Sequence, residues 1–226
     1  MLDFRWIPVL VVAAACASAS SSSDSDGGFS FADARPVDRP DAARADAGPR
    51  ADATCTQQLL VNGDFDQSQG LGASKQITPW REGHADAVPF LIAAASELPA
   101  PVTPNSGGYS ASLGTTAANH ALYLTFDVPA DATALELRGQ RWVISSEGQF
   151  IDHDFLYINL TVDGDREQLV SWDEDQTSSG WEPFSEEIPT SYVGNTVTLE
   201  LQALTNDDDP TQFFLDDLEV EASLCN

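Results

Sequence analysis

Hydrophobic and polar residues alternate along most of the chain after residue 57, and this pattern limits the fold more than any other feature. In residues 196–203, Val, Leu, Leu and Ala occupy every second position, and Thr, Glu and Gln lie between them. A period of two is typical of strands with one face on a core and the other in water. Together with turn-forming residues between the runs, it predicts an antiparallel β-sandwich of about nine short strands. These runs are residues 59–61, 109–113, 122–128, 135–144, 156–162, 168–172, 181–188, 196–203 and 213–220.

Residues 1–16 are typical of an exported lipoprotein. One basic residue, Arg5, precedes an apolar run over residues 6–15, which suits a signal peptide and is shorter than the roughly 20 residues of a membrane span. Three alanines then precede Cys16, an arrangement that resembles the bacterial lipobox. The resemblance implies lipidation of Cys16 and, because Ala17 follows it, the outer membrane of a Gram-negative bacterium. The alternative is ordinary secretory cleavage after residues 17–19, which would leave a free exported protein.

Residues 17–54 run from a Ser tract into a mixture of Ala, Asp, Arg and Pro with few large apolar side chains. The segment shows neither helical nor strand periodicity, so it has no apolar face to bury and we expect a disordered linker. The linker would hold one folded domain, residues 55–226, away from the lipid surface.

The chain is strongly acidic, with 10 Lys and Arg against 36 Asp and Glu and a formal net charge of −26. Residues 55–226 keep 5 of the basic and 28 of the acidic residues. A polyanion repels nucleic acid and anionic headgroups, which argues against both as partners and leaves the lipid anchor as the expected membrane contact. The carboxylates suit either a solvated surface or binding of a hard cation such as calcium.

Three cysteines in an exported protein leave one without a disulfide partner unless it has another use. Lipidation would use Cys16, so that Cys55 and Cys225 are free to pair across the whole predicted domain. A bridge of this span requires a fold that brings its two ends together.

Two segments at the ends of the domain carry a family resemblance. Residues 59–66, Leu-Leu-Val-Asn-Gly-Asp-Phe-Asp, are followed by Thr-Pro-Trp at 78–80, and residues 213–220 read Phe-Phe-Leu-Asp-Asp-Leu-Glu-Val. These resemble the opening and closing strands of galactose-binding-like jelly rolls, which include many carbohydrate-binding modules. The resemblance implies a jelly-roll sandwich over residues 55–226 with its first and last strands adjacent, as a bridge between its end cysteines requires.

Family members often carry a structural calcium beside those strands. Carried over by position, the resemblance implies that Asp66 and Asp216 bind it, with Asp64 and Asp217 as neighbours that could substitute. Asp216 shares the parity of core residues, and an inward carboxylate needs a partner. The alternative partner is a set of backbone hydrogen bonds at a strand end.

Aromatic residues on the predicted strands are the candidate ligand contacts. Tyr157 occupies a polar position of its strand, and Trp142, Trp172 and Trp181 lie on strands that could border one sheet, where flat rings stack on sugars or peptides beside polar groups. Of these, Tyr157, Trp172 and Trp181 are the predicted ligand contacts. The alternative is that long loops such as residues 82–108 cover these rings as a satellite core.

Catalysis has little support in the sequence. His84, His120 and His153 fall in no metal-protease or nucleophile pattern, and paired acids such as residues 173–175 lie in predicted loops. We therefore predict no catalytic residue and a non-catalytic, membrane-tethered module that binds carbohydrate or another extracellular polymer. The alternative is an assembly lipoprotein that binds another protein through an apolar patch or free sheet edge.

Overall fold

The computed structural model describes residues 55–67, 79–83, 90–146 and 154–225. The predicted signal peptide, Cys16 and the linker over residues 17–54 lie outside the described residues, as do His84 and His153. The structure within these ranges is almost entirely β, with one turn of 3-10 helix, η1 (Thr190–Tyr192). No helix in the described part of the chain is long and apolar enough to cross a membrane.

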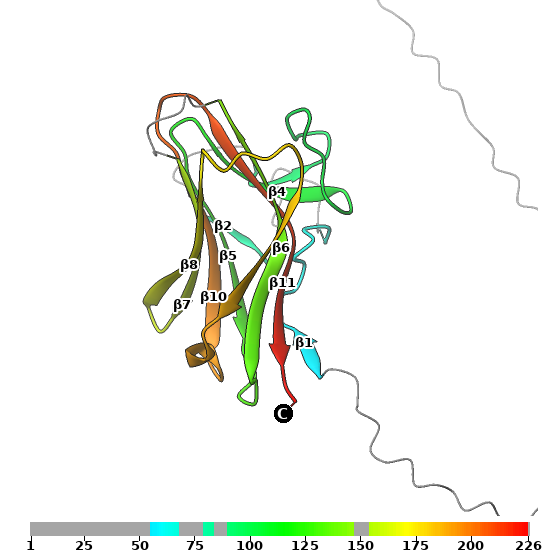
Figure 1. Ribbon diagram of the computed structural model, residues 1–226, viewed down its shortest axis with the longest axis vertical. Coiled ribbons are helices and arrows are strands. Elements are labelled where there is room, and N and C mark those ends of the chain that lie inside the picture. Colours follow the sequence, from blue (N-terminus) through cyan, green and yellow to red (C-terminus); the bar gives the residue numbers. More distant parts are fainter. Residues whose placement is uncertain (1–54, 68–78, 84–89, 147–153, 226) are drawn as a thin grey trace, which may run out of the picture. The chain divides into compact units, whose positions relative to one another are not determined.

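In the described residues, eleven strands form two antiparallel sheets that stack face to face (Figure 1). The six-stranded sheet has the order β3-β4-β11-β6-β9, with β1 also paired to β11, and the five-stranded sheet has the order β2-β5-β10-β7-β8. The strands are β1 (Thr56–Gln58), β2 (Arg81–Gly83), β3 (Ile92–Ala94), β4 (Tyr109–Thr115), β5 (Asn119–Asp127), β6 (Ala134–Ser145), β7 (Phe155–Val162), β8 (Asp165–Asp173), β9 (Glu182–Ile188), β10 (Thr196–Leu204) and β11 (Thr211–Ser223).

The chain passes from one sheet to the other at most of its connections. Only β3–β4 and β7–β8 are sequential strands that pair within one sheet. The predicted antiparallel jelly-roll sandwich is therefore confirmed, with two differences in its strands. The first strand lies at Thr56–Gln58 instead of residues 59–61, and the segment predicted as a loop, residues 82–108, contains β3. Strands of three residues are too short to show a period of two, which is why β2 and β3 give no signal.

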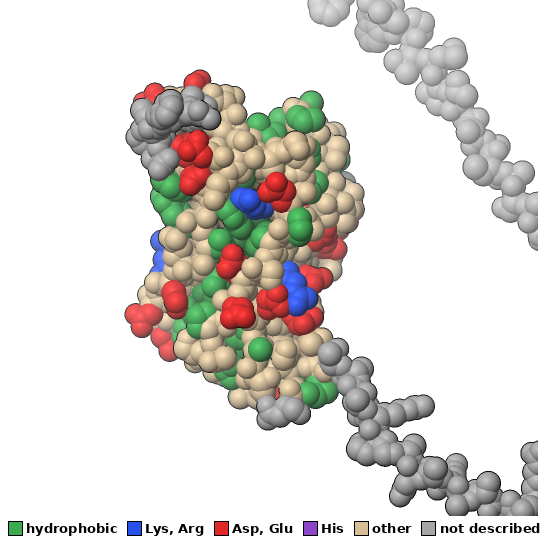
Figure 2. All heavy atoms as spheres, in the orientation of Figure 1, with side chains coloured by type: hydrophobic (Ala, Val, Ile, Leu, Met, Phe, Trp, Pro, Cys, Tyr) green, Lys and Arg blue, Asp and Glu red, His purple; other side chains and the backbone are tan. Residues whose placement is uncertain are grey.

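The core lies between the sheets and follows the predicted alternation. Val197, Leu199 and Leu201 of β10 are all fully buried, whereas the residues between them reach the other face of the sheet. The surface is acidic: in Figure 2, Asp and Glu side chains are spread over the visible face, and Lys and Arg form only small areas.

A disulfide between Cys55 and Cys225 closes the domain, with the two Cα atoms 5.4 Å apart. It is adjacent to the pairing of β1 with the end of β11, where Thr56 faces Ser223 (Figure 1). The predicted bridge is confirmed. Because the bridge spans 170 residues, it lowers the conformational entropy of the unfolded chain. In the chain-entropy model this stabilises the folded state by about 5 kcal/mol.

Candidate functional site

The three aromatic residues predicted as ligand contacts lie in three different environments. Trp172 is in the core, with 7% of its surface exposed. Its ring packs edge-on against Phe184, with centroids 4.8 Å apart, and the Arg141 guanidinium lies 5.2 Å from its centroid. Trp172 pairs with Leu156, whose side chain also faces the core, so the ring points inward. The structure thus places Trp172, a predicted ligand contact, among the core residues.

Trp181 lies over the outer face of the other sheet, the six-stranded one. Its ring makes an edge contact with Trp142 at 5.9 Å, and its Nε1–H donates to the Thr103 carbonyl oxygen at 2.7 Å. Trp142, Phe214 and Val102 form a buried apolar cluster there, against which Trp181 packs. The covering loop is residues 95–108, so the satellite-core alternative holds for Trp181.

Tyr157 is on the outer face of the five-stranded sheet, as its parity in β7 predicts. Its ring stacks on Phe155, with centroids 5.6 Å apart and an interplanar angle of 21°. Tyr157 pairs with Gln202 of β10 and with Ser171 of β8, which places three ligand-competent side chains in a row across the sheet. Of the three predicted contacts, Tyr157 alone is placed on a sheet face outside both apolar clusters.

The neighbouring row crosses all five strands of this sheet. The strand registers place its residues opposite one another in the order Arg81, Tyr123, Glu200, Asn159 and Gln168. On the other side of this row, Thr125 of β5 faces Thr198 of β10, and their hydroxyl oxygens are 3.2 Å apart. We call these three neighbouring rows the polar face of the five-stranded sheet.

Glu200 is the electrostatic centre of the polar face. Its carboxylate lies 2.7 Å from Arg166 Nη2 and accepts a hydrogen bond from Asn159 Nδ2 at 3.3 Å. Burial, the charge of Glu200 and a hydrogen bond to it together raise the pKa of Tyr123, so the phenol stays protonated. The one carboxylate of these rows is therefore neutralised and fixed by its neighbours.

The polar face also contains small residues that leave room beside the Tyr123 ring. A Cβ atom on Gly83 would lie 2.6 Å from Tyr123 Cε2, so the ring can occupy its position only over a glycine. A hollow of about 370 Å³ opens next to it, lined by Pro79, Arg81, Tyr123, Thr125 and Thr198. An aromatic ring beside hydroxyl, amide and guanidinium groups is the chemistry that binds a polyol or sugar ring.

The sequence analysis singled out Tyr157 of the polar face but not its neighbours Tyr123, Glu200 and Arg166. The signal for Tyr123 and Glu200 was present, since both occupy polar positions of alternating strands. Their proximity depends on the pairing of β10 with both β5 and β7, which no sequence period encodes.

The acidic residues predicted to bind calcium hold a loop by hydrogen bonds. Asp216 is fully buried, and its Oδ2 accepts the N–H groups of Asn105 at 2.8 Å and Ser106 at 3.3 Å. Its Oδ1 accepts the Asp217 N–H at 2.8 Å. Burial raises the pKa of Asp216 to about 7, against the effect of these hydrogen bonds.

Two more carboxylates bind the same loop. The Asp217 oxygens accept hydrogen bonds from Asn105 Nδ2 and Ser106 Oγ, both at 2.6 Å. Asp66 Oδ1 accepts the N–H groups of Gly108 at 2.8 Å and Tyr109 at 3.2 Å. We call Asp66, Asp216 and Asp217 the carboxylate clamp. Asp64 is not part of it, because its Oδ1 accepts only the local Asp66 N–H, at 3.4 Å.

The oxygens of the carboxylate clamp face hydrogen-bond donors of residues 105–109. Within the described ranges, no three Asp, Glu, His or Cys side chains are placed to share a metal ion. The backbone hydrogen bonds considered as the alternative for Asp216 are what the geometry shows. Calcium at this position stays a prediction.

The described histidine, His120, has a structural position. It is buried at the start of β5, and its Nδ1 accepts the Gly114 N–H at 3.2 Å. This hydrogen bond fixes the tautomer with the proton on Nε2.

No protein-family model and no curated protein matches the chain. Among solved structures, it is similar to TmCBM61 in complex with β-1,4-galactotriose, at 12% identity and a TM-score of 0.49, over 73% of this chain and 97% of that one. It is also similar to the K2 cleaved adhesin domain of Lys-gingipain, at 14% identity and a TM-score of 0.46, over 74% and 99% of the two chains. A third is the CBM22-1 xylan-binding domain from Paenibacillus barcinonensis Xyn10C, at 12% identity and a TM-score of 0.40, over 72% and 93%. At these identities and TM-scores, none of the likenesses assigns a ligand to this chain.

Proposed function

We propose that the protein is a non-catalytic carbohydrate-binding module whose ligand lies on the polar face of the five-stranded sheet. The observation that carries this proposal is the row from Arg81 through Tyr123, Glu200 and Asn159 to Gln168, with Tyr157 in the next row. Tyr157 would stack on a sugar ring, and the amide, hydroxyl and guanidinium groups would bind its hydroxyls.

A binding role suits the polar face better than a hydrolytic one. Glycosidases use two carboxyl groups on either side of the bond that they cleave, one of them free to donate a proton. The three rows contain one carboxylate, Glu200, which is occupied by Arg166 and Asn159. Its neighbours therefore make Glu200 a fixed acceptor for hydroxyl groups.

The proposal includes the export and tethering predicted from the sequence. A lipid on Cys16 would anchor the protein in the outer membrane, and residues 17–54 would let the domain reach polymers beyond the lipid surface.

One observation favours the second candidate function, binding of another protein. Val61 is 57% exposed and lines an apolar hollow of about 410 Å³ with Leu59, Leu124 and Phe126. This hollow lies along the part of β5 beyond its pairing with β2, which involves only Ala121, Leu122 and Tyr123. An apolar groove beside a sheet edge is a known way to bind an extended peptide.

A glycan array followed by calorimetry of the best saccharide tests the proposed function. We expect Tyr157→Ala to weaken binding at least tenfold, because the stacking ring is lost. The matched control is Trp181→Ala, which removes a ring from the opposite sheet and should leave affinity unchanged. An array without any saccharide hit, or affinity that depends on Trp181 and not on Tyr157, contradicts the proposal.

A further inference from the structure

A second acidic site lies where β7 begins and β10 ends. Asp154 immediately precedes β7 and is fully buried, and Glu174 follows β8 with 5% of its surface exposed. The Asp154 N–H donates to Glu174 Oε2 at 3.2 Å, and Asp154 Oδ1 accepts the Asn206 N–H at 2.7 Å. The backbone of one acid therefore contacts the carboxylate of the other, and both are held at the ends of adjacent strands.

The second oxygen of Asp154 is left without a partner. Asp154 Oδ2 is inaccessible to solvent and has no hydrogen bond, and the ion pairs of the described residues involve Arg138, Arg141 and Arg166 but not Asp154. A buried, unpaired carboxylate oxygen costs several kcal/mol unless something binds it. The position therefore calls for a bound species beyond the partners that the described residues supply.

The charge around this position favours a cation over a lone water molecule. Asp207, Asp208 and Asp209 follow Asn206, and Asp173 and Asp175 flank Glu174, so acidic side chains surround the buried pair in sequence on two strand ends. Repulsion among carboxylates raises the free energy of the ion-free state, and a divalent cation relieves it. Calcium accepts two carboxylates and completes its shell with backbone carbonyls and water.

We propose that Asp154 and Glu174 bind a divalent cation, with calcium as the best match for an all-oxygen site. The ion would join the ends of β7, β8 and β10, three adjacent strands of the five-stranded sheet. Among the described residues no third acidic, His or Cys side chain joins this pair, and backbone carbonyls and water would supply further ligands.

Calorimetric titration of the oxidised, chelator-treated protein with calcium chloride tests this site. We expect saturable binding that Asp154→Asn weakens at least tenfold, because the substitution keeps the shape and the acceptor for Asn206 but removes the charge. Glu174→Gln should weaken binding similarly, which provides a second variant if Asp154→Asn does not fold. The matched control is Asp208→Asn, which removes one charge from an exposed position beside Asn206 and should leave the affinity unchanged.

Asp217→Asn distinguishes this site from the carboxylate clamp. Binding that depends on Asp217 and not on Asp154 would place the ion at the clamp and overturn the proposal. Titration with no saturable heat would also overturn it, because Asp154 Oδ2 would then have a partner other than a divalent cation.

Discussion

The two sheets expose very different outer faces, although the same alternation of residues builds both. The outer face of the six-stranded sheet is covered at one end by residues 95–108, which bury Phe214 and Trp142 and are held by the carboxylate clamp. The polar face of the five-stranded sheet has a row of polar side chains and Tyr157 instead. An outward aromatic residue is thus a core residue on the first sheet and a candidate ligand contact on the second.

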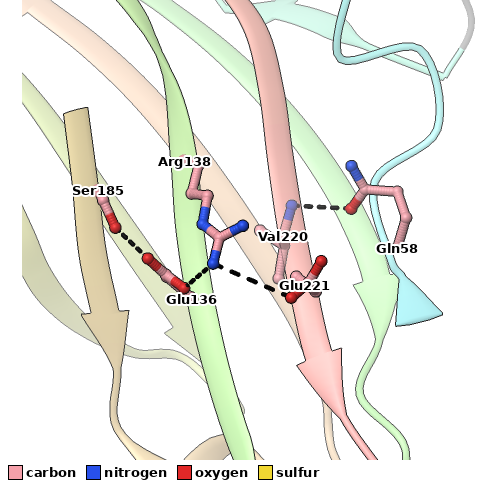
Figure 3. Close-up of polar contacts among 6 residues, drawn as sticks. All are labelled: Gln58, Glu136, Arg138, Ser185, Val220 and Glu221. Atoms are coloured by element: carbon pink, nitrogen blue, oxygen red, sulfur yellow. Dashed lines mark hydrogen bonds and ion pairs between the residues drawn. The ribbon is translucent and has the colours of Figure 1, made fainter. Parts of the chain in front are cut away.

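The remaining part of the six-stranded sheet carries a network of exposed charges. Arg138 of β6 lies between Glu136 and Glu221, and Ser185 donates to Glu136 (Figure 3). The hydrogen bonds from Arg138 and Ser185 lower the pKa of Glu136 to about 2. Beside it, the Gln58 side-chain oxygen accepts the Val220 N–H at 2.9 Å and helps to attach β1 to β11. This area carries exposed charged side chains and no aromatic ring in the network, in contrast to the polar face with Tyr123 and Tyr157.

The largest expected effect is on the free energy of unfolding, which should fall much more for a variant on the covered six-stranded sheet than for one on the polar face. Phe214→Ala leaves a cavity in a fully buried cluster and should lower the free energy of unfolding by about 3–5 kcal/mol. Tyr157→Ala should lower it by about 1 kcal/mol or less, because the ring lies on the outer face. Urea denaturation of both variants measures the difference. Equal losses would mean that Tyr157 is also a core residue.

The pH dependence of stability tests the carboxylate clamp. Because the pKa of Asp216 rises from 3.8 to about 7 on folding, the folded protein keeps a proton that the unfolded chain loses near pH 4. The contribution of Asp216 is therefore fully present below pH 4 and is lost as the pH rises through about 7. The difference in the free energy of unfolding between the wild-type protein and Asp216→Asn should fall between pH 4 and 8, by at most about 4 kcal/mol. A difference that grows with pH would show a carboxylate stabilised as the anion.

Gly83→Ala sharpens the description of the polar face. The new Cβ atom would meet the Tyr123 ring at 2.6 Å and displace it, so saccharide affinity should fall several-fold with a stability change of about 1 kcal/mol. Gly180→Ala is the control, because no atom lies within 4 Å of a Cβ at that position. Calorimetry on both variants checks this, and unchanged affinity in Gly83→Ala would exclude the Tyr123 ring from the site.

The smallest expected effect concerns the exposed network of the six-stranded sheet. Arg138→Ala should change the free energy of unfolding less than any of the other variants, because exposed ion pairs are screened by water and salt. Saccharide affinity should not change at all. A loss of saccharide affinity in this variant would indicate that the ligand binds the six-stranded sheet, which contradicts the proposed function.

Much of the fold could be predicted from the sequence, because alternation is a local property. It gave the inward side of β10, the outward position of Tyr157 and, with the cysteine count, the bridge from Cys55 to Cys225. Coverage of a sheet by a distant loop is not local, so Trp181 could not be distinguished from a ligand contact. The inward position of Trp172 depends on its pairing with Leu156 after a register shift between Ile158 and Asn159, which no period predicts.

The carboxylate clamp could be predicted from the sequence only in part. Asp66, Asp216 and Asp217, which the opening and closing motifs singled out, all accept hydrogen bonds from residues 105–109. Asp216 and Asp217 bind Asn105 and Ser106. This contact could not be predicted from the sequence, because the loop and β11 lie more than 100 residues apart.

Mapping of backbone amide chemical shifts during titration with a saccharide from the array tests the central claim most directly. The account predicts that the largest shifts fall on β5, β10 and β7, around Tyr123, Glu200 and Tyr157, with the loop over residues 95–108 unaffected. Shifts concentrated on that loop and around Trp181 would contradict it and place the ligand on the six-stranded sheet.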